Sequence, residues 1–476
     1  MTRKKKLIGA GVLLVLLVGG YFGATAYRKA KIEKQAEAYK SIYMTEIDTK
    51  KVVRIELPLK GVILERKEET WTSPAEALGV KLDQEEVNSI LWSLCNMRAD
   101  RIIDENPPDL SVFGLKDAKA RVVLTLDDGS RVELLGGDTT PTKNGYYGMK
   151  SGDTKVYLLP SYPGERLYVS LTDFRNRKLP SFNADEIEQL VLSYGSTKIA
   201  IELKPSEGAL EASFTTHILT SPYKVPRGVD GEAFQKLVSK IGDLRIKDFV
   251  DDNPVSLTKY GLDKPAIELF VKGKEATLHL LIGKEAQEAA PEWEANGVFA
   301  KLKDSPSVFL LEDIRSDLRI KPFDLIDKFA FIINIDKVDK LVIDFRGTRY
   351  TGEIKREKTT VTEKDAEGKE TQREETKETF YFEGNEVKEN TFKDFYQSCI
   401  GLLIDAELPS GGRPSGKAEV TLDYYLNDPA GKRVRIQYLP FNQDFYILSR
   451  EGSQEFLVSR RQLDKVGESI KKITAP

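Results

Sequence analysis

One segment near the C-terminus has the spacing of a phosphate-binding loop. Residues 411–417 read GGRPSGK and fit the pattern G-x-x-x-x-G-K. In nucleotide-binding proteins that loop continues into Ser or Thr, which binds Mg²⁺, and into a helix whose N-terminus faces the phosphates. Here Ala418 follows, and residues 419–424 alternate between polar and apolar side chains as in a strand. The pattern therefore predicts a connecting loop, and we expect no nucleotide there.

Two acidic turns carry side chains that could bind a metal ion. Residues 104–107 (DENP) and 251–254 (DDNP) offer the oxygen ligands that Ca²⁺ prefers, but neither has the D-x-D-x-D-G spacing with a distant Glu. Asp and Asn before Pro also form turns. Because the element occurs twice, as an architectural feature would, we interpret it as a structural corner rather than a metal site. We expect Arg98 and Arg245 to pair with the first aspartate of each turn.

The chain contains only two histidines and two cysteines, which limits nucleophilic and metal chemistry. His217 and His279 lie in strand-like segments without a matching partner, so we interpret both as polar residues on strand faces. Cys95 and Cys399 fall on two predicted helices in separate units. Free cysteine behaves as a small buried hydrophobe, so we expect two thiols and no disulfide.

The sequence contains no G-x-S-x-G, H-E-x-x-H or G-x-G-x-x-G motif. We therefore predict no catalytic, cofactor-binding or metal-ligating residue, no cofactor, and a protein that is not an enzyme. The acidic pair Asp127-Asp128 leaves a hydrolase open as an alternative, because two carboxylates can act as acid and base.

Composition narrows the class of protein further. Lys and Arg number 72 and Asp and Glu 75, so the net charge is −3 and no basic excess is available to bind a nucleic acid. Hydrophobic residues make up 40% of the chain, enough for ordinary cores. At about 150 residues per domain, the 476 residues predict about three domains.

The N-terminal segment has the pattern of a membrane anchor. A basic head, residues 1–6, precedes 21 uncharged residues, 7–27, which as a helix would reach roughly 30 Å and cross the hydrocarbon of a bilayer. We predict a transmembrane signal anchor, with signal-peptide cleavage after Ala26 as the alternative. A short basic head usually stays inside, so we expect a single-pass protein of the bacterial cytoplasmic membrane with residues 28–476 outside it. Residues 28–46 are interpreted as a charged stalk.

The rest of the chain contains internal repeats. A displacement of 147 residues aligns Arg98 with Arg245, Gly136 with Gly283 and one acidic turn with the other. A five-residue insertion then raises the displacement to 152. The predicted repeat units are residues 47–182, residues 187–329 and a diverged third unit, residues 335–472.

Each unit is predicted to be α+β. Alternating segments such as 53–57 and 341–345 indicate strands, and apolar residues at helical spacing in 87–94 and 234–241 indicate one main helix per unit. Hairpins follow the helix, one of them through an Asp-Asp-Gly turn at 127–129. The predicted fold class is thus an N-terminal transmembrane helix followed by tandem strand-rich units, each a mostly antiparallel sheet with one main helix.

A charge-rich tract interrupts the third unit. Residues 353–378 include 16 charged residues of mixed sign, and threonines alternate on both sides of a turn-forming DAEG segment. We predict a long solvated hairpin, with disorder as the alternative, and interpret it as an arm that contacts a partner. Trp293 is interpreted as an exposed anchor in a loop of the second unit.

The order of several motifs is similar to that of a known family. The motifs are Trp71-x-x-Pro74, a helix, Arg98, Phe113-Gly114-Leu115, Leu135-Gly136 and Val156-Tyr157-Leu158. They resemble the domain of unknown function family DUF4340 in the first and second units, whereas the third unit lacks the Tyr-Gly-Leu element. The resemblance implies a bacterial protein that carries the domain in tandem behind one N-terminal span. Such proteins are often encoded beside gliding-type ABC transporter components, and no catalytic residue is established for them.

The sequence therefore predicts a non-enzymatic, membrane-anchored extracytoplasmic scaffold. The family resemblance implies that it is accessory to an ABC-type, gliding-associated transporter, with permease and ATPase subunits as partners and with neither nucleic acid nor nucleotide. The alternative is an envelope module that binds a wall polymer, glycan or small molecule.

Overall fold

The computed structural model describes residues 42–78, 80–204, 215–289, 296–364, 370–428 and 431–475, together with Tyr21, Thr25, Tyr27 and Arg28. Most of the predicted membrane span, the basic head and Trp293 lie outside these residues. Tyr21 and Thr25 are helical, and the Thr25 hydroxyl donates to the Tyr21 carbonyl oxygen at 2.9 Å. A search of the described residues finds no helix with the length and apolar character of a membrane span.

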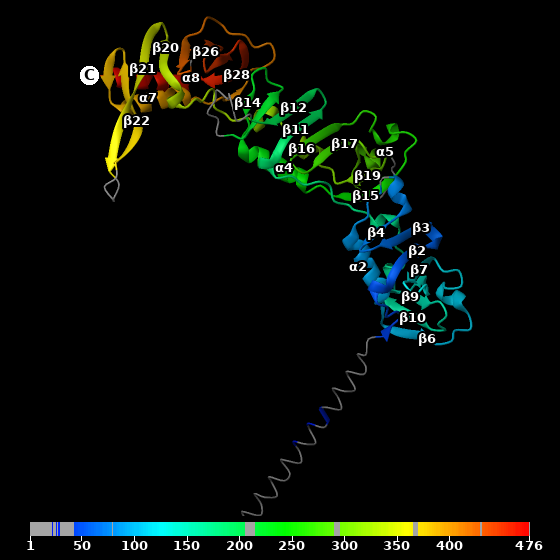
Figure 1. Cartoon of the computed structure of the whole chain (residues 1–476). Coiled ribbons are helices and arrows are strands. Elements are labelled where there is room, and N and C mark those ends of the chain that lie inside the picture. The colour runs from blue at the N-terminus through cyan, green and yellow to red at the C-terminus, as the bar shows by residue number, and fades with distance from the viewer. Residues whose placement is uncertain are drawn as a thin grey trace, which may run out of the picture. The chain divides into compact units, whose positions relative to one another are not determined.

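Two compact units make up the chain, divided between Arg177 and Lys178. The first contains an eight-stranded antiparallel sheet in the order β4-β3-β2-β7-β8-β9-β10-β6 (Figure 1). Its strands are β2 (Val52–Leu57), β3 (Val62–Lys67), β4 (Thr70–Thr72), β6 (Arg101–Asp104), β7 (Ala120–Leu126), β8 (Arg131–Thr139), β9 (Gly145–Lys150) and β10 (Val156–Pro160). The helices of this unit are α2 (Gln84–Cys95) and the short α3 (Ser161–Glu165).

The first unit begins earlier in the chain than predicted. Strand β1 (Ile42–Tyr43) pairs with β5 (Arg98–Ala99), and Met44 and Thr45 are buried. The Thr45 hydroxyl donates to the Leu94 carbonyl oxygen at 2.7 Å, which ties the segment to the end of α2. Residues 42–46, which the prediction included in the stalk, therefore belong to the folded unit.

The second unit contains two nine-stranded antiparallel sheets in the described residues. The first of them contains β11 (Ile187–Tyr194), β12 (Thr197–Leu203), β13 (His217–Ser221), β14 (Arg227–Gly228), β15 (Ile246–Asp251), β16 (Ile267–Gly273), β17 (Thr277–Glu285), β18 (Val298–Leu302) and β19 (Val308–Leu311), with α4 (Gly231–Gly242), α5 (Ala286–Ala289) and α6 (Arg315–Leu318). The other contains β20 (Val338–Phe345), β21 (Thr348–Lys364), β22 (Glu370–Phe382), β23 (Asn385–Val387), β24 (Ala406–Glu407), β25 (Val420–Leu426), β26 (Arg433–Pro440), β27 (Phe445–Arg450) and β28 (Ser453–Ser459), with α7 (Glu389–Ile400) and α8 (Arg460–Thr474).

One strand order describes all three sheets. The first long strand, β2, β11 or β20, lies inside its sheet. On one side it pairs with the next strand in the sequence, β3, β12 or β21, and on the other with the first strand of the later meander, β7, β16 or β25. The first strand of the sheet after the main helix, β6, β15 or β24, returns to the far edge and pairs with the last strand of the meander. This order contains no parallel pairing, so the helix is an insertion between hairpins and not a βαβ crossover.

The main helices form where the sequence provides a cap and one apolar face. Asp83 caps α2 by accepting from the backbone N–H groups of Glu85 and Glu86, and Asp230 caps α4 in the same way through Ala233. The residues predicted to form the buried faces are buried: Val87, Ile90, Leu91 and Leu94 in α2, and Phe234, Leu237, Val238 and Ile241 in α4. Each fully buried aliphatic side chain of this kind contributes about 1.5–3 kcal/mol.

The two sheets of the second unit share one hydrophobic core. A single cluster of buried residues extends from Leu179 to Ile473 and includes side chains of α4, α7 and α8. The first unit has a separate cluster, which extends from Met44 to Phe174. The sequence units predicted as 187–329 and 335–472 thus fold as parts of one compact body.

A glycine contact recurs in the first and second sheets. Gly114 and Gly261 each have φ of 67° and end the 3-10 helices η4 (Leu110–Phe113) and η7 (Thr258–Tyr260). A Cβ on Gly137 would lie 2.1 Å from the Phe113 carbonyl oxygen, and a Cβ on Gly283 would lie 2.1 Å from the Tyr260 carbonyl oxygen. Only glycine lets β8 and β17 approach these loops.

This contact corrects the sequence alignment at one position. The equivalent of Gly283 is Gly137, not Gly136 as the fixed displacement of 147 predicts. The strand register agrees, since Ala120 pairs with Gly136 in the first sheet and Ile267 pairs with Ile282 in the second. The β16–β17 turn is one residue shorter than the β7–β8 turn, and this deletion shifts the later positions.

Replacing Gly283 by alanine is therefore expected to destabilise the second unit by about 1–3 kcal/mol, because the new Cβ would force the Tyr260 loop away from β17. The matched control is Gly231→Ala at the start of α4, where a Cβ would meet nothing within 4 Å. That control should be neutral or stabilise by about 0.5 kcal/mol. Urea unfolding followed by circular dichroism measures both, and equal midpoints would contradict the expected close contact.

Candidate functional site

The two cysteines are buried and free, as predicted. Cys95 ends α2 and Cys399 lies in the last turn of α7, so they occupy corresponding helices of the first and third sheets. Burial raises the pKa of each thiol to about 12. A nucleophilic or metal-binding cysteine instead requires a lowered pKa and access to solvent. In this conformation both thiols act as core residues.

Both cysteines should resist alkylation in the native protein. With a pKa of about 12, the thiolate fraction near pH 8 is roughly one part in ten thousand. Iodoacetamide labelling followed by mass spectrometry should therefore modify neither residue without denaturant and both in urea. Rapid native labelling of either one would show that its helix opens or that the thiol is activated.

The histidines differ from the prediction, because both have specific partners. His217 is 2% exposed, its Nε2 lies 2.8 Å from the Ile187 carbonyl oxygen, and its ring packs on Phe234. His279 Nε2 lies 2.7 Å from Glu268 Oε1, and Lys303 reaches the same oxygen at 3.0 Å. The first histidine therefore joins β13 to the start of β11 inside the core, and the second belongs to a cross-strand charge group.

The acidic turns are structural, but the predicted arginine pairs do not form. Asp104 Oδ1 accepts from the Asn106 N–H at 2.9 Å, and Asp251 Oδ1 accepts from the Asn253 N–H at 3.1 Å. Arg245 donates instead to the carbonyl oxygens of Gly242, the last residue of α4, and of Leu244. Each aspartate thus closes its own turn, and this local bond competes successfully with a distant arginine. Among the described residues, no group of three or more His, Cys, Asp and Glu is placed to hold a metal ion.

The acidic pair of the β7–β8 turn is also engaged in the backbone. Asp128 Oδ1 accepts from the Ser130 N–H at 2.8 Å, and hydrogen bonding by Ser130 lowers the pKa of that carboxyl. A glycosidase acid requires a raised pKa. Asp128 therefore has the electrostatics of a turn residue.

The loop at 411–417 leads into a strand, as predicted. Gly411 has φ of 78°, and β25 begins at Val420 without an intervening helix. The helix N-terminus that a nucleotide-binding loop requires does not follow this segment.

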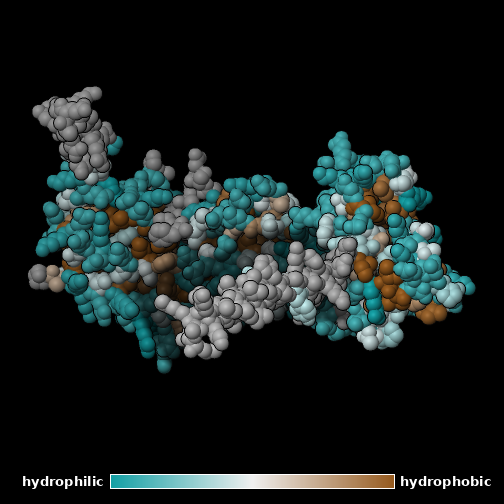
Figure 2. Space-filling view, turned by 90° about the horizontal axis from the view of Figure 1, so that it is seen from below, coloured by the Kyte–Doolittle hydropathy of each residue, from teal (hydrophilic) through white to brown (hydrophobic). Residues whose placement is uncertain are grey.

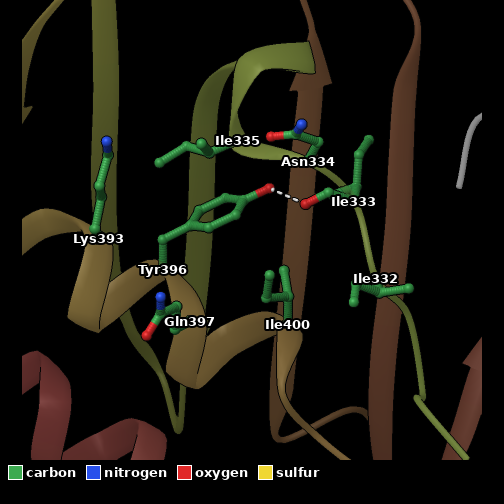
Figure 3. Close-up of a pocket in the computed structure, with 8 residues that line it drawn as sticks. All are labelled: Ile332, Ile333, Asn334, Ile335, Lys393, Tyr396, Gln397 and Ile400. Carbon is green, nitrogen blue, oxygen red and sulfur yellow. Dashed lines mark hydrogen bonds between the residues drawn. The ribbon is translucent and has the colours of Figure 1, made fainter. Parts of the chain in front are cut away.

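A small apolar cavity lies in the third sheet's part of the second unit (Figure 3). Its volume is about 360 Å³, and it separates the segment 332–335 from one face of α7. The lining residues are Ile332, Ile333, Asn334, Ile335, Lys393, Tyr396, Gln397 and Ile400. The Tyr396 hydroxyl donates to the Ile333 carbonyl oxygen at 3.0 Å, and burial raises the pKa of Tyr396. The cavity suits an apolar group, and the pKa values of its two ionisable lining residues are both raised, that of Lys393 by its hydrogen bond to Glu389 and that of Tyr396 by burial.

A buried arginine that no sequence pattern indicated joins the second and third sheets. Arg227 in β14 is 5% exposed and donates to the Phe329 carbonyl oxygen and, at 3.3 Å, to the Ala330 carbonyl oxygen. Its guanidinium carbon lies 5.2 Å from the centroid of the Phe456 ring in β28. Burial lowers the pKa of Arg227, while nearby carboxylates, Asp327 first, oppose the shift.

Residues close to Arg227 in the sequence also contact strands of the third sheet. The Tyr223 hydroxyl donates to Glu407 Oε1 in β24 at 2.6 Å, and the Lys224 N–H donates to Glu455 Oε1 in β28 at 3.1 Å. The rings of Tyr223 and Phe456 are 4.7 Å apart. We name the set Tyr223, Arg227, Glu407, Glu455 and Phe456 the inter-sheet joint. Its partners are separated by up to 233 residues along the chain, from Tyr223 to Phe456, so no local pattern could reveal it.

The charge-rich tract forms the predicted hairpin in the described residues. Pairing of β21 with β22 continues to Lys364 and Glu370, whereas pairing of β21 with β20 ends at Glu353, so the hairpin extends beyond the sheet (Figure 1). Arg356 holds its base by bonding Glu378 at 2.8 Å, Asp339 at 2.7 Å and the backbone carbonyl oxygens of residues 335 and 338. We name residues 357–364 and 370–377 the arm.

Comparison with known sequences finds a tandem match whose internal boundary, between residues 217 and 218, differs from the division of the compact units between Arg177 and Lys178. No curated protein and no solved structure matches the chain. The profile of a domain of unknown function, DUF4340, matches residues 71–217 and 218–403 in tandem. The first match begins at Trp71 of the W-x-x-P motif, and the two matches together cover more than half of the sequence. The chain therefore belongs to the DUF4340 family.

Proposed function

We propose that this protein is a non-enzymatic scaffold outside the bacterial cytoplasmic membrane, anchored by residues 7–27 and accessory to an ABC-type, gliding-associated transporter. The anchor is supported by the 21 uncharged residues behind a basic head. The transporter role is supported by what the resemblance to DUF4340 proteins implies about their neighbours. Permease and ATPase subunits are the proposed partners.

The observation that carries the scaffold role is the inter-sheet joint. A protein that positions its partners needs sheets whose mutual placement resists thermal motion. Arg227 and its buried partners give the second and third sheets that property, since separating them would leave a charge and two carbonyl oxygens without their bonds. Hydrophilic residues cover most of the face of the molecule visible in Figure 2, as expected for a surface that makes polar contacts.

The arm is the proposed contact with a partner. A two-stranded ribbon is marginally stable by itself in water. Beyond Glu353 and Phe380 the arm pairs with no other described strand. Its charged residues of both signs disfavour indiscriminate edge pairing, as lysine and glutamate do on natural edge strands.

Co-purification tests this role. The full chain with a C-terminal tag is extracted from its own membranes in mild detergent, and co-purifying proteins are quantified by mass spectrometry. A matched variant removes residues 359–375 and joins Lys358 to Thr376 through Asn-Gly, a two-residue turn that preserves the flanking pair and the Arg356–Glu378 bond. We expect near-stoichiometric transporter subunits with the parent protein and at least a tenfold loss with the variant, whose circular dichroism should otherwise match.

Recovery of the parent protein alone, with complete membrane extraction, would refute the transporter role. Equal recovery of transporter subunits by the parent protein and the variant would support the transporter role. It would also show that the arm is not needed for the contact.

The second candidate function, a ligand-binding module, is favoured by the isoleucine-lined cavity. Its lining is mostly apolar, which suits a small apolar molecule better than a glycan or a wall polymer. Native mass spectrometry of the purified chain would detect such a ligand, and Ile400→Phe should reduce its occupancy by filling the cavity. A protein free of ligand in both forms would count against this alternative.

A further inference from the structure

An open depression in the second unit gathers positive charge around the loop of residues 415–419. Its volume is about 730 Å³, and Arg346, Lys417, Pro440 and Arg460 line it together with that loop. Arg346 follows β20 in the tight β20–β21 turn, whereas Arg460 opens α8. Three cations from three distant parts of the sequence thus meet at one surface site.

Two of these cations are held in place by the fold. Arg460 Nη1 donates to the Tyr446 hydroxyl oxygen at 3.0 Å, and Arg460 Nε donates to the Asn442 carbonyl oxygen at 2.9 Å. The guanidinium carbon of Arg460 also lies 4.2 Å from the centroid of the Tyr446 ring. Arg346 Nη2 donates to Asp464 Oδ1 at 2.6 Å. An anion would therefore meet preorganised guanidinium groups, and little side-chain entropy would be lost on binding.

The nearby carboxylates are already occupied. Glu419 Oε2 accepts from the Tyr446 hydroxyl at 2.6 Å and from Arg460 at 3.4 Å, while Asp464 is paired with Arg346. Lys417 is exposed and forms no ion pair with any described residue. The depression therefore keeps a surplus of one positive charge after its internal pairs are counted.

The loop backbone supplies further donors. Ser415 N donates to the Pro440 carbonyl oxygen at 2.8 Å and Glu419 N to the Tyr438 carbonyl oxygen at 3.0 Å, so both ends of the loop are pinned to β26. Between them, the backbone N–H groups of Gly416, Lys417 and Ala418 make no hydrogen bond within the described part of the chain. Successive backbone N–H groups beside a lysine form the kind of concavity that binds anions.

We propose that this depression binds a phosphate group carried by a larger molecule, with Lys417 and the N–H groups of residues 416–418 as its direct contacts and with Arg346 and Arg460 as its positive walls. This ligand differs from a nucleotide, since the loop leads into β25 and no helix N-terminus follows it. Wall polymers and lipid head groups both carry such phosphates. The site lies apart from the arm and does not depend on the transporter role.

Titration calorimetry of the full chain in detergent tests the site, first with inorganic phosphate. The test variant is Lys417→Gln, and the matched control is Arg413→Gln, an exposed cation of the same loop that does not line the depression. We expect saturable binding to the parent protein, at least a tenfold weaker affinity for Lys417→Gln, and affinity within twofold of the parent for Arg413→Gln. The affinity should fall as salt is added.

Two further probes distinguish the sources of phosphate. Glycerol 3-phosphate represents a water-soluble polymer unit, and dihexanoyl phosphatidylglycerol represents an anionic lipid head group. Dihexanoyl phosphatidylcholine, which is zwitterionic and has no net charge, is the lipid control. Tighter binding of either anionic probe than of inorganic phosphate, lost in Lys417→Gln, supports the site and names its source. Absence of saturable binding to the parent protein, or equal affinities of Lys417→Gln and Arg413→Gln, would overturn the proposed phosphate site. Neither result bears on co-purification with transporter subunits, so the two proposals fail separately.

Discussion

Replacing Arg227 by leucine is expected to lower the free energy of unfolding of the second unit by about 3–5 kcal/mol. The guanidinium is almost completely buried, so its removal leaves the Phe329 and Ala330 carbonyl oxygens without a donor in a site that water does not enter easily. The Asp327 and Glu455 carboxylates would also lose their electrostatic interaction with this buried cation. Most of this loss of stability comes from leaving buried polar groups without hydrogen bonds. That penalty is larger than the net contribution of the same hydrogen bonds to the stability of the native protein.

A second substitution separates charge from geometry. Arg227→Lys keeps the cation, but an ammonium group cannot present a planar fork to two carbonyl oxygens while stacking on the Phe456 ring. We expect an intermediate loss of stability for this variant. Arg433→Leu is the control, because Arg433 is about half exposed and lies 3.8 Å from Asp423. Exposed ion pairs of that kind contribute less than about 1 kcal/mol.

Urea unfolding of the full chain, followed by circular dichroism, measures these differences, and hydrogen exchange with mass spectrometry assigns them to segments. Exchange should rise first in β14, β24 and β28, while the first unit keeps its protection. An unchanged midpoint for Arg227→Leu would mean that the two sheets are held together by their shared apolar core alone. The inter-sheet joint would then no longer support the proposed scaffold role.

Local patterns in the sequence predicted the elements well, for a physical reason. The helical face of Val87, Ile90, Leu91 and Leu94 is buried because a helix has only one stripe to turn towards a sheet. Gly114 and Gly261 take positive φ because the next residue must reverse the chain. Such features depend on neighbours within a few residues, and the sequence displays those neighbours directly.

Contacts between distant segments were not predictable in the same way. Arg245 was expected to pair with Asp251, yet it donates to the carbonyl oxygens of Gly242, at the end of α4, and of Leu244, which are its close neighbours in the sequence. His217 became a core residue because its ring nitrogen reaches the Ile187 carbonyl oxygen, 30 residues away. The inter-sheet joint and the depression proposed to bind phosphate bring together residues that are still farther apart in the sequence. In both, the residue types were visible in the sequence, but their convergence required the fold.

Replacing Trp71 by alanine should destabilise the first unit by about 3–5 kcal/mol, since its indole is completely buried and the surrounding core cannot collapse to fill the space. The side chain also donates from Nε1 to Asn88 Oδ1 at 3.1 Å. The Trp71 backbone exchanges two hydrogen bonds with the Gln84 amide, at 2.8 and 2.9 Å. Trp71 thereby clamps β4 to the first turns of α2, and losing it should loosen both elements together.

The first unit contains its own control for this prediction. Trp92 lies on the outer face of α2 and is 62% exposed, so Trp92→Ala should change stability by less than about 0.5 kcal/mol. Trp71→Phe should fall between the two, because it keeps most of the packing but removes the donor to Asn88. Similar midpoints for Trp71→Ala and Trp92→Ala in urea would show that the W-x-x-P motif serves something other than the core. A large difference confined to the first unit would instead identify the motif, where the family match begins, as an element of folding.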